Sequence, residues 1–165
     1  MQQGGPAARV KSPPMTPSAP HDDAPHADVF SWPVRVYYED TDSYGVVYYA
    51  NYFRFLERAR TEWLRALGFD QVEMSAAGHG FVVRSVKGEY LKPAHFNDAL
   101  EVRCHISGVS RVAIDFAQRL YRGDALLFDG VVRVVCINPA LGRPVSIPTA
   151  LRERLAPSPL PPLPT

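Results

Sequence analysis

The stretch VYYEDTDSYGVVYYANY, residues 36–52, decides how this chain folds. A strand-like alternation precedes it, and a segment of helical period follows it as far as Leu67. Between the two lies a hinge that carries three acidic residues, a glycine and a cluster of tyrosines. A carboxylate on such a hinge faces the N–H groups of a helix's first turn, which lack partners within the helix. We therefore expect the chemistry of the protein at this hinge.

The residues on either side of the hinge predict one strand and one long helix. In the expected strand, Trp32–Glu39, apolar and polar side chains alternate. In the expected helix, apolar residues recur at steps of three and four and form a single face. Gly68 stands where a glycine commonly ends a helix. The apolar face comprises Tyr52, Phe55, Leu56, Ala59, Trp63 and Leu67.

The second half of the chain contains strand patterns and no further strong helical pattern. A connector, residues 69–80, has room for one short helical turn at residues 70–74. Gly123 and Asp124 offer a tight hairpin turn. One long amphipathic helix followed by an antiparallel meander predicts an α+β fold with the sheet curled around the helix. The four expected strands are Phe81–Lys92, Ala99–Val109, Ala113–Arg122 and Ala125–Asn138.

Composition limits the class of protein. The 165 residues carry a formal charge of +1 and no basic stripe, which argues against a nucleic-acid partner. Cys104 and Cys136 lie in apolar runs and are interpreted as buried thiols, and no metal-ligand spacing occurs. No run reaches the roughly 18 apolar residues of a membrane span. With no apolar segment of a secretory signal near the N-terminus, we expect a cytoplasmic protein without a membrane span.

Proline-rich segments flank the expected domain. Residues 1–31 contain prolines, alanines and almost no large apolar side chain, and are expected to be disordered. Residues 156–165 hold five further prolines and are expected to form an extended tail. A single folded domain is therefore expected at residues 32–155.

The hinge resembles that of the hotdog-fold acyl-CoA thioesterases. The closest resemblance is to the Tol–Pal-associated thioesterases and their 4-hydroxybenzoyl-CoA thioesterase relatives. The strings YEDTD (38–42), GVVY (45–48), ANY (50–52) and ERARTE (57–62) carry it, and it continues more weakly to Pro148. The resemblance implies a five-stranded antiparallel sheet around a central helix. It also implies hydrolysis of an acyl-CoA to the free acid and coenzyme A.

Asp42 is the expected catalytic residue. A thioester is activated enough for one carboxylate to attack it or to deprotonate water, and no serine-hydrolase elbow is present. The resemblance assigns the catalytic carboxylate to the position of Asp42; the alternative is that Asp42 only caps a turn. Asp40 shares a face with Asp42 in an extended chain, so it either couples to Asp42 or ties down the turn.

The resemblance also implies residues around Asp42. The backbone N–H of Tyr49 is the expected oxyanion donor, although many family members have histidine there, which leaves the substrate preference open. Tyr38 matches a site tyrosine, or is a core aromatic. Unpaired first-turn N–H groups are expected over residues 46–49. Gly45 permits either a positive φ or close approach of an acyl chain. The expected substrate-binding residues are Tyr38, Gly45, Val46, Tyr48 and Arg111.

More distant groups complete the set of candidates. Arg111 lies between two strands, where related enzymes grip the phosphates of coenzyme A, and Lys87 and Lys92 are alternatives. Glu57 either imitates a helix-borne base or pairs within the helix. His79, His95 and His105 share no spacing and are interpreted as structural or surface residues.

We expect no metal or organic cofactor, since coenzyme A belongs to the substrate. A homodimer or homotetramer is expected, and acyl carrier protein is a further possible partner. The alternative function is a hotdog module that binds acyl-CoA or acyl carrier protein without turnover.

Overall fold

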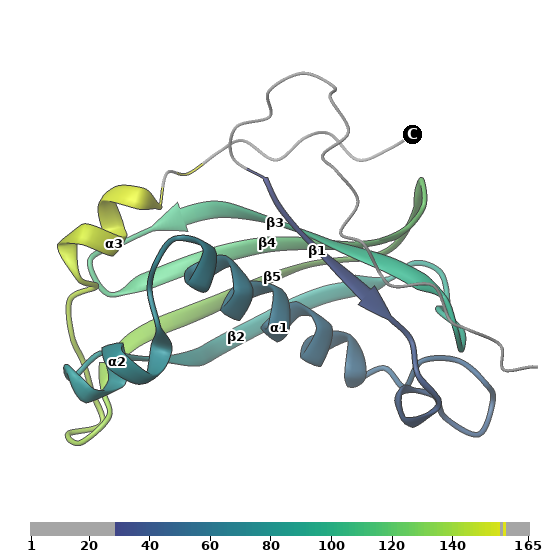
Figure 1. Cartoon of the computed structure of the whole chain (residues 1–165), viewed down its shortest axis with the longest axis horizontal. Helices are drawn as coiled ribbons and strands as arrows, with labels where there is room; N and C mark the ends of the chain where they lie inside the picture. The colour runs from purple at the N-terminus through teal and green to yellow at the C-terminus, as the bar shows by residue number, and fades with distance from the viewer. Residues whose placement is uncertain (1–28, 156, 158–165) are drawn as a thin grey trace, which may run out of the picture.

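An antiparallel sheet and one long helix make up the fold of the computed structural model, which describes residues 29–155 and residue 157. The strand order is β1-β3-β4-β5-β2, and the short β6 pairs with β5. Helix α1 lies along one face of the curved sheet, with α2 and α3 towards one end (Figure 1). The strands are β1 (Phe30–Arg35), β2 (Gly80–Tyr90), β3 (Ala99–Val109), β4 (Ala113–Arg122), β5 (Ala125–Asn138) and β6 (Arg143–Pro144). The helices are α1 (Asn51–Ala66), α2 (Gln71–Ala76) and α3 (Thr149–Arg154).

The predicted α+β hotdog arrangement is confirmed, and β3, β4 and β5 have the predicted bounds. The hairpin at Gly123 joins β4 to β5 as expected, with a φ of 55° at the glycine. The possible helical turn after Gly68 is α2, whose N-cap Asp70 accepts hydrogen bonds from the N–H groups of Val72 and Glu73. Helix α3 and strand β6 were not predicted. Phe30 and Ser31, expected to be disordered, instead begin β1, where they pair with Cys104 and Arg103 of β3. The rest of the two proline-rich tails, apart from residues 29 and 157, lies outside the described residues.

Two boundaries next to the hinge were predicted wrongly. Strand β1 ends at Arg35 instead of Glu39, because residues Tyr38–Asp40 form a 3₁₀ turn. In that turn the N–H of Asp40 bonds the carbonyl of Tyr37, which replaces pairing in the sheet. Helix α1 begins only at Asn51, so the N–H groups of residues 46–49 do not belong to its first turn.

The core lies between α1 and the concave face of the sheet. Phe55, Leu56 and Ala59 on α1 are fully buried. Facing them are buried side chains of the strands: Val102, Ile106, Ile114, Leu120, Leu127 and Phe128. Each buried Leu, Ile or Phe contributes about 1.5–3 kcal/mol, so this helix face and the sheet stabilise one another.

One polar network lies inside that core. The guanidinium Nη1 of Arg60 donates to Oε1 of Gln118 at 2.7 Å. Gln118 in turn donates to the carbonyl of Leu56 at 3.0 Å and contacts the thiol of Cys104. Burial raises the pKa of Cys104 to about 12 and lowers the pKa of Arg60. Cys104 and Cys136 are both buried free thiols, as predicted.

A pair of glycines seats an aromatic ring against the sheet. Gly88 on β2 lies opposite Gly130 on β5. A Cβ at Gly88 would come within 2.3 Å of the Phe128 ring, and one at Gly130 within 2.7 Å of that ring and 2.8 Å of the Lys87 carbonyl. Phe128 is fully buried, so its position requires that neither residue carry a side chain.

We predict that Gly130→Ala lowers the free energy of unfolding by about 1–3 kcal/mol, because the new methyl group overlaps a buried ring and a strand carbonyl. Urea unfolding followed by circular dichroism measures the change. Gly108→Ala is the matched control in β3, since the atoms nearest to its Cβ belong to the side chain of Asp115, the closest at 3.2 Å. Equal stability of the Gly130 variant and the wild type would show that Phe128 does not need this glycine.

Candidate active site

A tight turn presents Asp42. The N–H of Asp42 bonds the carbonyl of Val46 at 2.9 Å, and the N–H of Gly45 bonds the carbonyl of Asp42 at 3.0 Å. Gly45 has a φ of 76°, and a Cβ there would meet nothing within 4 Å. Of the two alternatives for Gly45, the positive φ is therefore what this turn requires.

The two carboxylate oxygens of Asp42 have different surroundings. Oδ1 accepts a hydrogen bond from the N–H of Tyr44 at 2.8 Å, so Asp42 also stabilises its own turn. Oδ2 has no hydrogen-bond partner among the described residues, and the side chain is only half-buried. One oxygen is thus held in place while the other is open to a substrate or a water molecule.

Asp40 anchors the turn from inside the protein. Its side chain is 3% exposed, and Oδ2 accepts the N–H of Tyr37 at 2.8 Å. Its carbonyl accepts the N–H of Tyr48 at 2.9 Å and the side-chain amide of Asn51 at 2.9 Å. The interpretation of Asp40 as the residue that ties down the turn is confirmed. The hydrogen bond from Asn51 to Asp40 was not predicted, because an asparagine at a helix start commonly caps its own helix.

The backbone N–H groups of residues 46–49 do not form the expected set of free donors. Val47 donates to the carbonyl of Ala94 at 2.8 Å, and Tyr48 donates to Asp40. This part of the prediction is wrong, since long-range pairing takes up these groups before the helix starts. Within the described chain, the N–H groups of Tyr49 and Ala50 have no hydrogen-bond acceptor. Tyr49 therefore retains a backbone donor that a ligand could use.

Side chains from two other elements support this region. The hydroxyl of Tyr90, at the end of β2, donates to the carbonyl of Tyr49 at 2.9 Å. The hydroxyl of Tyr52 accepts the N–H of Ala94 at 3.2 Å, in the loop between β2 and β3. Tyr90 was not singled out from the sequence, and Tyr52 was named only in the apolar helix face and in a string that carries the resemblance. The hydrogen bonds of both were missed because their partners are distant backbone atoms that no local pattern reveals.

The same β2–β3 loop is fixed by charge. Asp98 accepts Nη1 of Arg122 at 2.7 Å and the N–H of His95 at 2.9 Å. The pKa of Asp98 lies below its ordinary value because its hydrogen bonds to His95 and Arg122 outweigh the opposing effect of desolvation. Since Ala94 of this loop pairs with Val47, the charged cluster indirectly steadies the turn that carries Asp42.

The predicted substrate-binding residues do not all lie close together in the structure. Tyr38 is 75% exposed and stacks on Phe96, with ring centroids 3.7 Å apart, so its interpretation as a core aromatic is wrong. Tyr48 is also exposed and lies against Tyr49. Arg111 is exposed and donates to the Ser146 hydroxyl at 3.0 Å.

Arg111 lies at the opposite end of the sheet from the hinge. The hinge end is marked by the pairing of Arg35 with Ala99, and β3 then runs past Phe30, opposite Cys104, before it reaches Arg111. One chain alone therefore does not bring Arg111 and Asp42 together.

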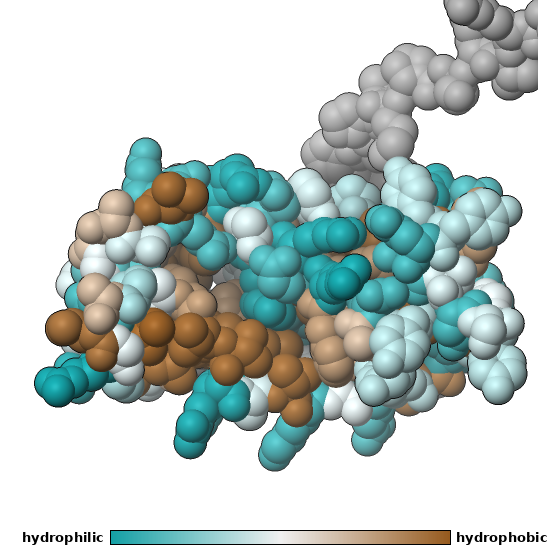
Figure 2. Space-filling model, turned by 90° about the horizontal axis from the view of Figure 1, so that it is seen from below, coloured by the Kyte–Doolittle hydropathy of each residue, from teal (hydrophilic) through white to brown (hydrophobic). Residues whose placement is uncertain are grey.

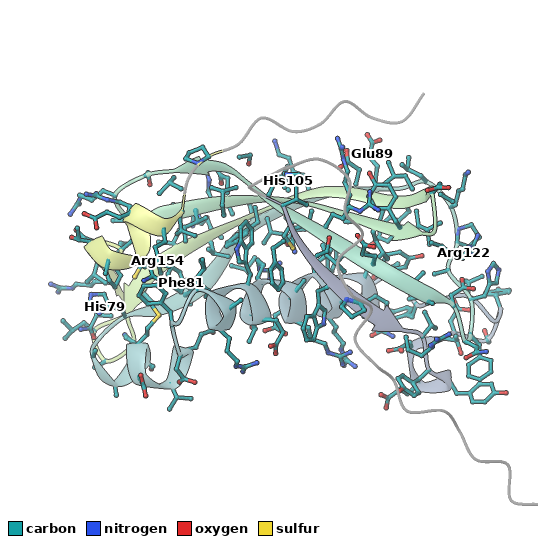
Figure 3. All side chains as sticks on the ribbon, turned by 45° about the horizontal axis from the view of Figure 1, so that its top comes forward. His79, Phe81, Glu89, His105, Arg122 and Arg154 are labelled. Carbon is teal, nitrogen blue, oxygen red and sulfur yellow. The ribbon has the colours of Figure 1, made fainter. Side chains whose placement is uncertain are left out.

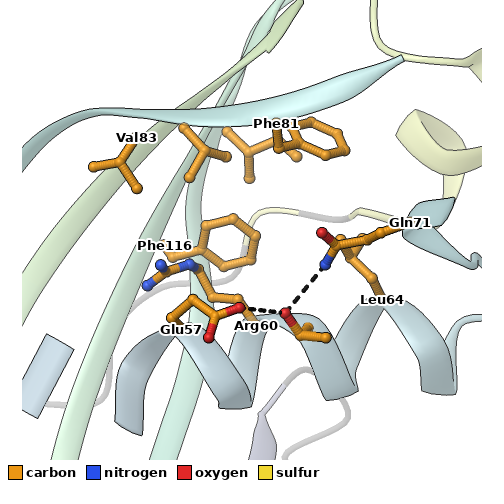
Figure 4. Close-up of a pocket in the computed structure, with 10 residues that line it drawn as sticks. Glu57, Arg60, Leu64, Gln71, Phe81, Val83 and Phe116 are labelled. Atoms are coloured by element: carbon orange, nitrogen blue, oxygen red, sulfur yellow. Dashed lines mark hydrogen bonds between the residues drawn. The ribbon is translucent and has the colours of Figure 1, made fainter. Parts of the chain in front are cut away.

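Two neighbouring cavities lie between α1 and the sheet on the β2 side. The smaller one, about 100 Å³, is walled by Phe81, Val83 and Phe116 and contains the polar groups of Glu57, Arg60 and Gln71 (Figure 4). The larger one, about 340 Å³, is lined by Phe53, Arg54, Glu57, Arg60, Val83, Val86 and Val132. Asp42 lines neither cavity.

Glu57 takes part in side-chain bonding at the mouth of the smaller cavity. Its carboxylate accepts the hydroxyl of Thr61 at 2.7 Å, and that hydroxyl accepts an N–H of Gln71 at 3.1 Å (Figure 4). The interpretation of Glu57 as a residue that pairs within the helix is confirmed.

The described histidines, His79, His95 and His105, do not form a cluster with other metal-ligating side chains. His79, just before β2, and His105, on β3, are well separated (Figure 3). Over residues 29–155, no three His, Cys, Asp or Glu side chains are grouped so that they could hold a metal ion. None of the helices in that range is long and apolar enough to cross a membrane.

Comparison with known proteins identifies relatives of this chain. The family model of the thioesterase-like superfamily matches residues 36–155. Acyl-CoA thioester hydrolase YbgC of Escherichia coli O6:H1 is 44% identical over 124 residues, which cover 74% of this chain and 92% of that protein. Acyl-CoA thioesterase YbgC of Haemophilus influenzae is 43% identical over 124 residues, with 74% and 91% covered. A solved structure, a probable thioesterase from Bartonella henselae, has a TM-score of 0.69 at 33% identity and covers 73% of this chain and 99% of its own.

We predict that Asn51→Asp lowers the free energy of unfolding by about 1–3 kcal/mol, because a carboxylate cannot donate to the buried carbonyl of Asp40. Chemical denaturation at pH 7 measures the loss. Arg54→Ala, an exposed change on the same helix, should stay within about 0.5 kcal/mol of the wild type. If Asn51→Asp were as stable as Arg54→Ala, the bond to Asp40 would not hold the turn.

Proposed function

This chain belongs to the thioesterase-like superfamily, and on that premise we propose that it hydrolyses acyl-CoA thioesters with Asp42 as the catalytic carboxylate. The observation that supports this role of Asp42 is that only one of its two carboxylate oxygens accepts a hydrogen bond from a described residue. Oδ1 is fixed by the N–H of Tyr44, and Oδ2 is left without a partner among the described residues. A fixed carboxylate with one open oxygen is what a nucleophile or a general base needs.

The reaction needs one water molecule. As a general base, Asp42 takes a proton from water while the water oxygen bonds the thioester carbon. As a nucleophile, Asp42 bonds that carbon itself and forms an anhydride that water then opens. In both routes the C–S bond breaks, the thiolate of coenzyme A leaves and is protonated, and the acid is released. The two routes differ in the fate of labelled water oxygen, which enters the carboxylate of Asp42 only in the nucleophilic route.

The backbone at Tyr49 supports the negative charge that develops on the carbonyl oxygen. Its N–H has no acceptor within residues 29–155 and lies two residues before α1, whose N-terminal dipole favours an anion nearby. Because this role belongs to the main chain, tyrosine can replace the histidine that many family members have at this position. The exposed rings of Tyr48 and Tyr38 are then available to contact the acyl or pantetheine part of the substrate.

We predict that Asp42→Asn lowers kcat by at least about 100-fold while KM changes little, because the amide can neither attack the carbonyl nor accept a proton. Thiol release from a panel of acyl-CoAs, with acyl carrier protein thioesters as a second panel, measures the change. Asn keeps the turn-capping ability of Asp, so stability should change by about 1 kcal/mol or less. Asp40→Asn is the control and should lower stability more than turnover. If folded Asp42→Asn kept over about a tenth of wild-type kcat, Asp42 would not be the catalytic residue.

A second copy of the chain is proposed to complete the site. The open edge of the sheet at β2 consists of eleven residues without proline and carries the exposed apolar side chains of Val82, Val83 and Val86. The other edge, β1, has six residues and contains Pro33, which cannot donate to a neighbouring strand. A band of hydrophobic side chains is exposed on the face seen in Figure 2. These features favour pairing through β2.

Antiparallel pairing of two β2 edges would also bring Arg111 of one chain closer to Asp42 of the other. A two-fold axis beside β2 places the hinge end of one sheet next to the opposite end of its partner's sheet. A copy of Arg111 would then lie on the same side as Asp42, where its guanidinium could bind the phosphates of coenzyme A. The cavities beside α1 and β2 would become enclosed at the same time.

We predict a particle mass of at least twice the 18.3 kDa of one chain at micromolar concentration. Light scattering coupled to size-exclusion chromatography measures it. Val86→Lys should weaken the assembly, because it places a charge beside the pairing edge. Val72→Lys, at an exposed position of α2, is the matched control and should leave the mass unchanged. A monomeric wild type would refute pairing through β2.

A further inference from the structure

The contact between Tyr90 and the Tyr49 carbonyl links the sheet to the backbone of the site. Tyr90 is the last residue of β2, and its hydroxyl reaches the residue that precedes Ala50 at the start of α1. The residues on either side of this position have backbone bonds of their own, since the N–H of Tyr48 bonds Asp40 and the N–H of Asn51 bonds the Tyr48 carbonyl. Between these two residues, the N–H groups of Tyr49 and Ala50 have no acceptor in the described part of the chain.

The geometry of the peptide unit determines what this contact does. A peptide is planar and trans, so the carbonyl of Tyr49 and the N–H of Ala50 point in opposite directions within one rigid unit. A hydrogen bond to that carbonyl fixes the orientation of the unit and thereby the direction of the Ala50 N–H. It also polarises the amide, which makes its N–H a stronger donor. The N–H of Tyr49 belongs to the preceding peptide unit, whose carbonyl, that of Tyr48, accepts the N–H of Asn51 at 2.8 Å. Both N–H groups are without acceptors in the described part of the chain.

The ring of Tyr90 is itself held firmly. It meets the rings of Tyr52 and Phe128 edge-on, with centroids 5.1 Å away in each case. Phe128 rests on the paired glycines Gly88 and Gly130. The hydroxyl is protonated at neutral pH and able to donate, and burial raises the pKa of Tyr90 further above neutrality. A chain of contacts thus runs from the glycine pair through the rings of Phe128 and Tyr90 to the carbonyl of Tyr49.

We propose that Tyr90 is a positioning residue for catalysis: its hydroxyl orients the Tyr49–Ala50 peptide unit so that the backbone N–H of Ala50 joins that of Tyr49 in binding the oxyanion. This inference rests on the proposed thioester hydrolysis. Tyr90 touches neither the substrate nor the reacting atoms in this role, and it acts through the main chain.

Tyr90→Phe tests the proposal, because it removes the hydroxyl and keeps the ring against Tyr52 and Phe128. Removal of a whole oxyanion donor costs about 10²–10³ in kcat, and loss of its orientation should cost less, about tenfold or more. KM should stay within about twofold. Tyr121→Phe is the control, since Tyr121 packs against Arg103 on another part of the sheet, and it should leave kcat unchanged. Incorporation of 4-aminophenylalanine at position 90, which restores a donor, should recover kcat.

A spectroscopic measurement separates positioning from stability. In the Asp42→Asn background, the stretching band of a ¹³C-labelled thioester carbonyl is recorded by difference infrared spectroscopy with and without Tyr90→Phe. Loss of oriented donors should shift this band towards its frequency in water. An unchanged band together with an unchanged kcat would overturn the proposal. A fall in kcat that accompanies a fall in melting temperature and is not recovered by the amino analogue would overturn it as well. If the wild type hydrolysed no acyl-CoA, the proposed function itself would fall, a result distinct from either of these.

Discussion

The site depends on a single buried acid, Asp40. It is 3% exposed, yet its carboxylate and carbonyl together accept three hydrogen bonds, from Tyr37, Tyr48 and Asn51. These donors come from the residue before the 3₁₀ turn, the far side of the hinge and the first residue of α1. A buried polar group must be satisfied, so none of these three segments can move without leaving a costly unpaired group. Asp42 owes its place at the surface to this neighbour two residues earlier.

The parts of the fold that local pattern determines were predictable from the sequence. The bounds of β3, β4 and β5 agree with the prediction because alternation, Gly108 and the turn at Gly123 are all local signals. The apolar face of α1 was predictable for the same reason. The start of α1 was not, since Val47 bonds Ala94 across the fold and withdraws residues 46–49 from the helix. Strand β1 ended early because Asp40 offered Tyr37 a nearer acceptor.

In the candidate site, too, the features set by local sequence were predictable and those set by long-range contacts were not. Asp42 and the positive φ of Gly45 follow from the turn that residues 41–47 form, and such turns have residue preferences that can be recognised. The support from Tyr52, Tyr90 and the pair of Asp98 and Arg122 joins residues far apart in the chain. No period or spacing encodes those contacts. The separation of Arg111 from Asp42 likewise became visible only once the register of β1 and β3 was known.

The strand order has a consequence for how the chain acquires its structure. Among the described strands, β2 pairs with β5 alone, and residues 91–124, which include β3 and β4, lie between the two in the sequence. During synthesis β2 emerges long before its partner, and its valines and its backbone remain unpaired until β5 has left the ribosome. Pairing over such a separation requires closure of a long loop, which slows folding. The nascent chain therefore passes through a period in which β2 is open to association with other chains.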